Sequence, residues 1–499
     1  EYVYTGNKSD LVGGRVKITA GNDARILGGK INGVDSGEIS AQNYLSIDGV
    51  LGTRSFKRDQ KTGGIMHTNE SASTSQNHYE KFIDSEISSD GDFRIFSQKD
   101  LYIDGSRINV NGKLDINANE KLTVQAARQQ QKIDEEKTRL SIEWFAKESS
   151  DKQYRAGILI NHQKDTENTL RDEHQIATLS AEQINITAGD DIKFFGTGIS
   201  TSKGDVIIKT PKNVGFFTAK NRALINKNQV NNSGGFYFTS GMDKTGNGLQ
   251  YTHIDKESYS DIENNLVVKT HIKGDLNINA GGDLNQQGTQ HDVAKNYSVE
   301  ASNINNMASN NLAFSKTDTL QVDVSIGNNI DHSGMTRPIE KVIKDPANTL
   351  DYIGGRGSQK GVSDPTIGLD VDVSGSRTKT SDNDALALVT SIKAQDIKQV
   401  AKKDVLDEGT QYHATEGGMS LQGARHFSRA AVNSKANTTE QEKGEVSLRG
   451  GMTATQEIKG HLGVKAETSQ GDSYAEEMLV GNINAKSGVS IKTTGDAYY

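Results

Sequence analysis

The chain has 499 residues, no cysteine, only 4 prolines and a formal charge of -8, with 33% hydrophobic residues. These values exclude a disulfide framework and a thiolate metal site, and they give no reason to expect nucleic acid as a partner. The low apolar fraction argues against several conventional globular cores, whereas a β-solenoid, whose core is a thin column closed by stacked coils, needs few large apolar residues per coil.

Short apolar triplets between Gly, Asn and Asp predict such coils throughout the chain. In residues 273–312, Leu276 and Tyr297 begin similar triplets, as do Leu284 and Ile304, so equivalent positions return after about 20 residues. We therefore expect an all-β fold: a right-handed parallel β-helix of roughly 20-residue coils. Asparagines crowd this stretch, and in stacked coils their amides would form ladders.

An Asp followed five residues later by a Gly recurs five times along the chain. We expect Asp to close one corner by bonding its own backbone and Gly to open the next corner with a positive φ. The irregular intervals between the five copies indicate insertions of different length between similar coils. The predicted structural corners are Asp23 and Gly28, Asp100 and Gly105, Asp191 and Gly196, Asp283 and Gly288, and Asp404 and Gly409.

Alternating apolar residues around polar turns predict β-hairpin arms between the coils. We expect arms at residues 138–161 and 235–255, a weaker one at 446–452 with 458–464, and a fourth at 367–373 with 385–392. A hairpin is marginal alone, so each arm should lie on the solenoid, pair with another arm, or await a partner. The aromatic residues of the arms are the candidate contacts to a partner or membrane: Trp144, Phe145, Phe236, Phe238 and Tyr251.

The prolines divide the chain into three predicted regions. Residues 1–336 and 366–499 read as coils with inserted hairpins, and three of the four prolines fall in 337–365, which we expect to interrupt the stack with a short helix. The first residues lack a signal peptide and the last lie within a repeat-like pattern. We therefore expect an internal fragment of a longer exoprotein.

The sequence contains few residue patterns that are typical of catalytic sites. Asp190 and Asp191 are the best adjacent carboxylates, but a capped turn explains them, and alternate strand residues point to opposite faces. The histidines lack HExxH spacing. We predict no catalytic, cofactor or metal site and no enzymatic activity.

The motifs ITAGDDIKFFGTGIS, INAGGDLNQQGTQ and VSLRGG, alternating with polar hairpins, resemble the filamentous haemagglutinin-like exoproteins of two-partner secretion. More narrowly, they resemble the second repeat region of contact-dependent growth inhibition effectors of the CdiA type. The resemblance implies a secreted cell-surface rod, exported through an outer-membrane transporter, that serves delivery of a C-terminal toxin across the target-cell outer membrane. The implied contacts are that membrane or a surface receptor, and the implied locations include the target-cell outer membrane or periplasm.

Two alternatives remain open from the sequence. One is an adhesin stalk that binds host or bacterial surfaces, and the other is a polysaccharide-binding or polysaccharide-cleaving β-helix of the tailspike or lyase type. The oligomeric state, the receptor and the toxin are not indicated by any motif.

Overall fold

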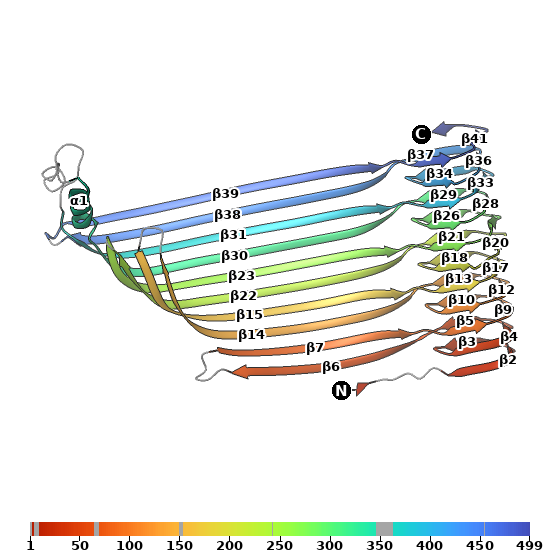
Figure 1. Cartoon of the computed structure of the whole chain (residues 1–499), viewed down its shortest axis with the longest axis horizontal. Coiled ribbons are helices and arrows are strands. Elements are labelled where there is room, and N and C mark those ends of the chain that lie inside the picture. Colours follow the sequence, from red (N-terminus) through yellow and green to blue (C-terminus); the bar gives the residue numbers. More distant parts are fainter. Residues whose placement is uncertain are drawn as a thin grey trace.

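The computed structural model describes residues 2–3, 9–63, 69–148, 153–241, 243–345, 363–453 and 455–499. It consists of a stack of short parallel strands with long strands projecting from one side (Figure 1). The short strands form three faces of a right-handed parallel β-helix, as the repeat spacing predicts. We call this stack the stalk.

Each coil of the stalk contributes one strand to each face. The first two faces merge at β2 (Asp10–Ala20) and β4 (Lys30–Ala41), which run through both. The other strands of the first face are β8 (Glu86–Ser89), β11 (Arg107–Val110), β16 (Thr178–Ala181), β19 (Gly198–Thr201), β24 (Lys269–Ile272), β27 (Gln290–Val293), β32 (Ser391–Ala394), β35 (Gln411–Ala414) and β40 (Asn482–Ala485). Those of the second face are β9 (Phe93–Ser97), β12 (Lys113–Ala118), β17 (Gln183–Ala188), β20 (Val206–Thr210), β25 (Leu276–Ala280), β28 (Asn296–Ala301), β33 (Asp396–Ala401), β36 (Met419–Gly423) and β41 (Val489–Thr493).

The third face is an 11-stranded parallel sheet. Its strands are β3 (Ala24–Leu27), β5 (Leu45–Asp48), β10 (Leu101–Asp104), β13 (Leu122–Gln125), β18 (Ile192–Phe195), β21 (Val214–Phe217), β26 (Leu284–Gln287), β29 (Ile304–Met307), β34 (Asp404–Glu408), β37 (Arg425–Arg429) and β42 (Ala497–Tyr498). In-register pairing stacks like on like, because Leu122 lies over Leu101 and Ile304 over Leu284. The buried column of Leu, Ile and Val that results is the hydrophobic core.

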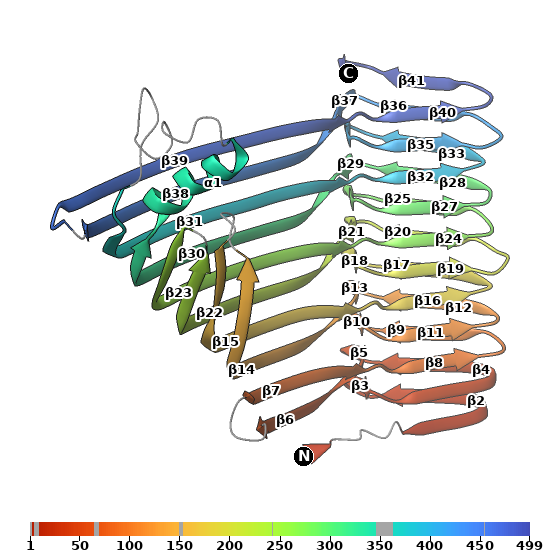
Figure 2. The same cartoon turned by 60° about the vertical axis from the view of Figure 1, so that its left-hand side comes forward.

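The long strands form a second kind of sheet, which we call the arm sheet. It is antiparallel, has 11 strands and extends away from the stalk (Figure 2). In chain order its strands are β1 (Tyr2–Val3), β6 (Val50–Gly63), β7 (Asn69–Ile83), β14 (Ala127–Glu148), β15 (Gln153–Gln175), β22 (Ala219–Gly241), β23 (Lys244–Leu266), β30 (Ser309–Asp331), β31 (Thr366–Leu388), β38 (Ala431–Thr453) and β39 (Ile458–Leu479).

The arms are longer than the sequence predicts, and one of the predicted hairpins is a single strand. The polar stretches on either side of residues 138–161 continue the same hairpin, which comprises β14 and β15. The predicted hairpin of 367–373 with 385–392 is wrong: Thr366–Leu388 is one continuous strand that pairs with β30 and β38. Pairing with neighbouring arms therefore explains strands that lack a continuous apolar pattern.

The described part of the proline-bearing segment begins with a helix at the far end of an arm, and the stack of coils continues past it. Helix α1 (Ser333–Lys344) follows β30 directly, and Pro338 lies inside it. Coil stacking passes from β29 to β34 without a break. The rest of the predicted interruption, residues 346–362, lies outside the described residues. In the described part of the chain, no helix is long and apolar enough to cross a membrane.

Two kinds of coil alternate along the stalk. One kind turns from the third face to the first through a glycine, and these glycines are Gly28, Gly105, Gly196, Gly288 and Gly409, each with φ between 53° and 62°. The next coil replaces that corner with a hairpin arm, as between β13 and β16 or between β21 and β24. The irregular intervals in the sequence therefore equal two coils plus one arm of variable length.

The corner aspartates act between coils and not on their own turns. The Oδ1 atom of Asp23 accepts the backbone N–H of Tyr44 at 3.2 Å, and Oδ1 of Asp100 accepts that of Lys121 at 3.0 Å. Asp191 accepts the N–H of Asn213 in the same way. The expected bond to the aspartate's own backbone is wrong at these positions, because stacking brings the next coil's N–H within reach.

The expected amide ladder is present in part. Nδ2 of Asn305 donates to Oδ1 of Asn285 at 2.9 Å, and Asn303 donates to Asp283 at 2.7 Å. Asn310 and Asn311 instead lie in the arm strand β30. Ladder residues are thus those on outward positions of stacked coils.

The core becomes polar in its C-terminal coils. His291 is buried; its Nδ1 contacts the hydroxyl of Thr270 at 2.9 Å and its Nε2 lies 2.5 Å from Oε1 of Gln286. This geometry fits a neutral ring that donates through Nε2. Burial lowers the pKa of His291 to about 3.

The polar chain continues upward through buried side chains. Gln286 donates to Asn306, which donates to Asp407 at 2.7 Å. Asp407 also accepts from Tyr412 at 2.7 Å and lies 2.8 Å from Nε2 of His426. Every member therefore has a partner, which is the condition under which buried polar groups are tolerated.

We predict that Gly288→Val lowers the free energy of unfolding by a few kcal/mol, because a β-branched residue is strained at φ 55° and its Cβ would lie 2.9 Å from the Leu388 carbonyl oxygen. The control is Gly21→Val, where φ is not positive and a Cβ meets open space. Thermal unfolding of the two variants measures the difference. Equal melting temperatures would contradict the corner assignment.

The depressed pKa of His291 predicts acid sensitivity. Unfolded His binds a proton below a pKa of about 6.5 and buried His291 does not, so its stabilising contribution is complete above that pH and is lost as pH falls towards its folded-state pKa of about 3. We expect a loss of about 2 kcal/mol between pH 6.5 and 5. Denaturant unfolding at several pH values measures the slope. His291→Gln should flatten it, and an unchanged slope would contradict this source of acid sensitivity.

Candidate functional site: the apolar face of the arm sheet

The outer half of the arm sheet carries apolar side chains on one side. Residues directly opposite each other on antiparallel strands share a face of the sheet. One such row crosses eight strands and contains only apolar residues: Trp144, Ile158, Phe236, Leu249, Ile326, Val371, Leu448 and Leu462. The next row on the same face contains Ile142, Ile160, Gly234, Tyr251, Val324, Val373, Val446 and Val464. We call this surface the apolar face.

Many side chains of the apolar face are open to solvent. Trp144 is 81% exposed, Leu249 62% and Leu462 67%. Helix α1 does not cover them, because it borders a cavity with residues of the opposite side, among them Asn329, Asp370 and Arg449. We call that opposite side the reverse face. An apolar surface that spans eight strands is far larger than the isolated apolar residues of an ordinary protein surface.

The half of the same face that lies nearer the stalk carries ion pairs beside apolar residues such as Leu312 and Leu320. Cross-strand ion pairs join β22 to β23 through Arg222 and Asp261 at 2.6 Å, and β30 to β31 through Arg377 and Asp318 at 2.7 Å. The arginine hydrogen bond lowers the pKa of each aspartate. This charged band therefore favours water at the base of the sheet, next to the apolar outer half.

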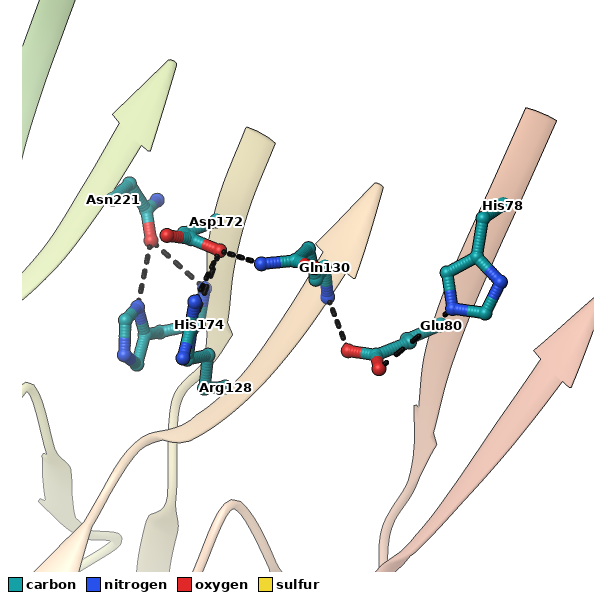
Figure 3. A network of polar contacts seen from close by, with 7 residues as sticks. All are labelled: His78, Glu80, Arg128, Gln130, Asp172, His174 and Asn221. Carbon is teal, nitrogen blue, oxygen red and sulfur yellow. Dashed lines mark hydrogen bonds and ion pairs between the residues drawn. The ribbon is translucent and has the colours of Figure 1, made fainter. Parts of the chain in front are cut away.

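A polar network fastens the arms to one another where they leave the stalk (Figure 3). Asp172 on β15 accepts from Arg128 at 2.8 Å and from Gln130 at 3.0 Å, both on β14. Burial raises the pKa of Asp172, but the hydrogen bonds from Gln130 and Arg128 outweigh it, so the pKa lies below its usual value. The backbone N–H of Gln130 in turn donates to Glu80 on β7.

A second contact recurs between each arm and the next. The third residue of the outgoing strand is Asn or Gln, and its side-chain oxygen accepts a backbone N–H from the returning strand of the preceding arm. The four pairs are Gln129 with Phe82 (3.1 Å), Asn221 with His174 (2.8 Å), Asn311 with Asn265 (2.7 Å) and Asn433 with Ala387 (2.8 Å). We call these four contacts the amide clasps, and they were not predicted from the sequence. Their only signal is an Asn or Gln at a nearly constant distance after four of the five corner glycines.

The structure unites four of the five predicted contact residues. Trp144, Phe236, Phe238 and Tyr251 all lie on the apolar face, and the rings of Phe236 and Phe238 meet edge to face at 4.6 Å. Phe145 points to the reverse face, because it is adjacent to Trp144 in a strand. The aliphatic residues that complete the face were not singled out from sequence, because their shared side depends on pairing between distant arms.

The candidate catalytic carboxylates have structural partners. Oδ1 of Asp190 accepts the N–H of Asp191, and Asp191 accepts from Asn213. Within the described ranges, no group of three or more His, Asp or Glu side chains is arranged to hold a metal ion.

Comparisons with known proteins give a repeat family and two relatives. Residues 66–232 match the hemagglutinin repeat family. The chain is 33% identical over 98% of its length to a protein named hemolysin from Serratia marcescens, and 29% identical over 97% to another hemolysin from Proteus mirabilis. No solved structure matches.

The chain spans 30% and 32% of the length of these two relatives. The chain is thus similar to the hemagglutinin repeat family over residues 66–232 and to a part of two hemolysins over nearly all of its own length.

Proposed function

We propose that this chain is a stalk segment of a secreted two-partner secretion exoprotein and that its arm sheet binds a target-cell membrane through the apolar face. The observation that carries the proposal is the unbroken apolar row across eight strands, open to solvent on one side of the sheet only. The names of the two relatives, hemolysins, support action at a membrane. Export would use an outer-membrane transporter partner.

The charged band gives the membrane contact an orientation. Apolar side chains gain free energy when they leave water, at about 25 cal/mol per Å² of apolar area. The ion pairs near the stalk, such as Arg222 with Asp261, are better kept in water. The outer half of the sheet would therefore lie against lipid while the stalk stays in solution.

We infer that the segment is not an enzyme. The best candidate carboxylates already accept structural hydrogen bonds, Asp190 from the backbone of Asp191 and Asp191 from Asn213 of the next coil. The alternative of a polysaccharide-cleaving β-helix would require paired carboxylates at another site. Surface glycans incubated with the chain should stay intact in mass spectra.

Delivery of a toxin across a target-cell outer membrane, as in contact-dependent growth inhibition, is the finer alternative. It uses the same apolar face but requires bacterial outer-membrane lipid and a toxin module elsewhere in the full protein. An adhesin stalk would instead bind a surface receptor, and its apolar face would not need to contact lipid.

The sole tryptophan, Trp144, provides a direct test. We predict that phosphatidylcholine and phosphatidylglycerol vesicles shift its fluorescence to the blue and protect it from acrylamide, because its exposed ring enters lipid. The matched control combines Trp144→Phe with Phe145→Trp, which moves the tryptophan to the reverse face of the same strand. That variant should show no shift.

A second variant tests the face itself. Leu448→Asp with Leu462→Asp places charge in the middle of the apolar row and should abolish vesicle binding without unfolding the stalk, because both residues are exposed. Absence of binding by the unaltered chain would refute the proposal, and a dimer in sedimentation would then place the apolar face between two copies.

A comparison of two kinds of vesicle separates toxin delivery from haemolysis. Toxin delivery requires binding to bacterial outer-membrane lipid, and haemolysis requires binding to erythrocyte lipid.

A further inference from the structure

Helix α1 lies near the far end of the arm sheet (Figure 2). A recess lies between α1 and the reverse face. Its volume is about 700 Å³, and β30, β31, β38 and β39 contribute to its wall together with α1. Sites for small molecules commonly have volumes of about 300 to 1,000 Å³. The recess is therefore large enough for one or two sugar rings.

Two glycines lie in the floor of this recess. Gly368 on β31 and Gly451 on β38 are cross-strand neighbours on the reverse face and both line the recess. A Cβ at Gly368 would lie 2.8 Å from the Gly450 carbonyl oxygen, and one at Gly451 would lie 2.6 Å from Cγ2 of Thr366. A side chain at either position would clash with the neighbouring strand, so the floor consists of backbone atoms that a ligand can approach.

The wall of the recess carries cationic side chains that form no ion pair with any described residue. Arg449 and His461 are cross-strand neighbours, and Lys459 follows on the same side of β39. Arg449 lies opposite Asp370 on β31, yet Asp370 accepts its hydrogen bond from Asn329. Within the described part of the chain, no ion pair joins Arg449 or Lys459 to a carboxylate.

Three acidic residues, Asp331, Asp364 and Asp370, also line the recess, and two of them have partners within its wall. Asp331 accepts the N–H of Ser333 at 2.9 Å and lies 4.0 Å from Nζ of Lys244. The positive charge of this recess contrasts with the formal charge of -8 of the whole chain. Such a local reversal of sign is typical of a site that attracts an anion.

We propose that this recess binds a phosphorylated saccharide. Arg449 presents a planar guanidinium that suits phosphate, and Lys459 adds a second positive charge. Side chains such as Asn329 and Ser363 line the same recess and can hydrogen-bond sugar hydroxyls, while the glycine floor accepts the ring.

The inference deepens the proposed function, because the recess lies at the end of the arms that would meet a target surface. A phosphorylated saccharide can belong to a glycolipid of that surface whose saccharide reaches round the end of the sheet to the reverse face, or it can be a free sugar phosphate in solution. The recess and the apolar face lie on opposite sides of the sheet, so the sugar would be bound from the side turned away from the lipid contact.

The test measures binding of glucose 1-phosphate, glucose and inorganic phosphate to the whole chain by calorimetry. We expect glucose 1-phosphate to bind at least tenfold more tightly than either of the others. Arg449→Glu and Lys459→Glu should each weaken that binding at least tenfold. Lys465→Glu, the same charge change on β39 outside the recess, should leave it unchanged.

Binding that is unaffected by both recess variants would overturn the proposal, and so would equal affinity for phosphate and glucose 1-phosphate. Melting temperatures check that the variants fold, which is expected because Arg449 and Lys459 are exposed. Vesicles with and without lipopolysaccharide then distinguish a glycolipid source from a free one. Since calorimetry with soluble sugars needs no membrane, failure here is separate from failure of the vesicle test of the apolar face.

Discussion

The distance between neighbouring β-strands is the constraint on which this structure depends. Strands in a sheet lie about 4.8 Å apart, so each coil raises the stack by one strand spacing. A hairpin arm is two strands wide and therefore occupies two spacings. One arm for every two coils lets the arms pair edge to edge without a gap, and this is the alternation that the corner glycines mark.

This match explains how polar arms remain ordered. An isolated hairpin is marginal in water, but here an arm pairs along most of its length with its neighbours, as β22 does with β15 of the preceding arm and β23 with β30 of the next. The amide clasps, such as Asn221 with His174, extend that pairing to the base. The stalk sets the register in which neighbouring arms pair. Because of that register, the apolar residues of the arms lie on one side of the arm sheet.

The stalk was more accessible to sequence reasoning than the arm sheet. Coil spacing, the positive φ of glycines such as Gly288 and the presence of hairpins are local signals, and the structure has all three. The length of the arms is not a local signal, because strands such as Asn69–Ile83 are polar and are held by their neighbours.

The candidate site shows the same limit. Trp144 and Phe236 are conspicuous in the sequence, but the row that joins them to Leu448 depends on pairing among arms that are hundreds of residues apart. The bonding of Asp23 to the next coil was missed for the same reason. A recess between α1 and Gly451 requires the fold before it can be seen at all.

The most direct test of the account changes the number of coils per arm. Removal of residues 197–288 takes out two coils and one arm and joins Gly196 to Thr289, so the alternation is kept. Removal of residues 196–217 takes out a single coil and leaves two arms one strand spacing apart. Hydrogen exchange of the arm amides should show protection in the first variant and its loss in the second. Equal protection in both would contradict the claim that strand spacing couples the arms to the stalk.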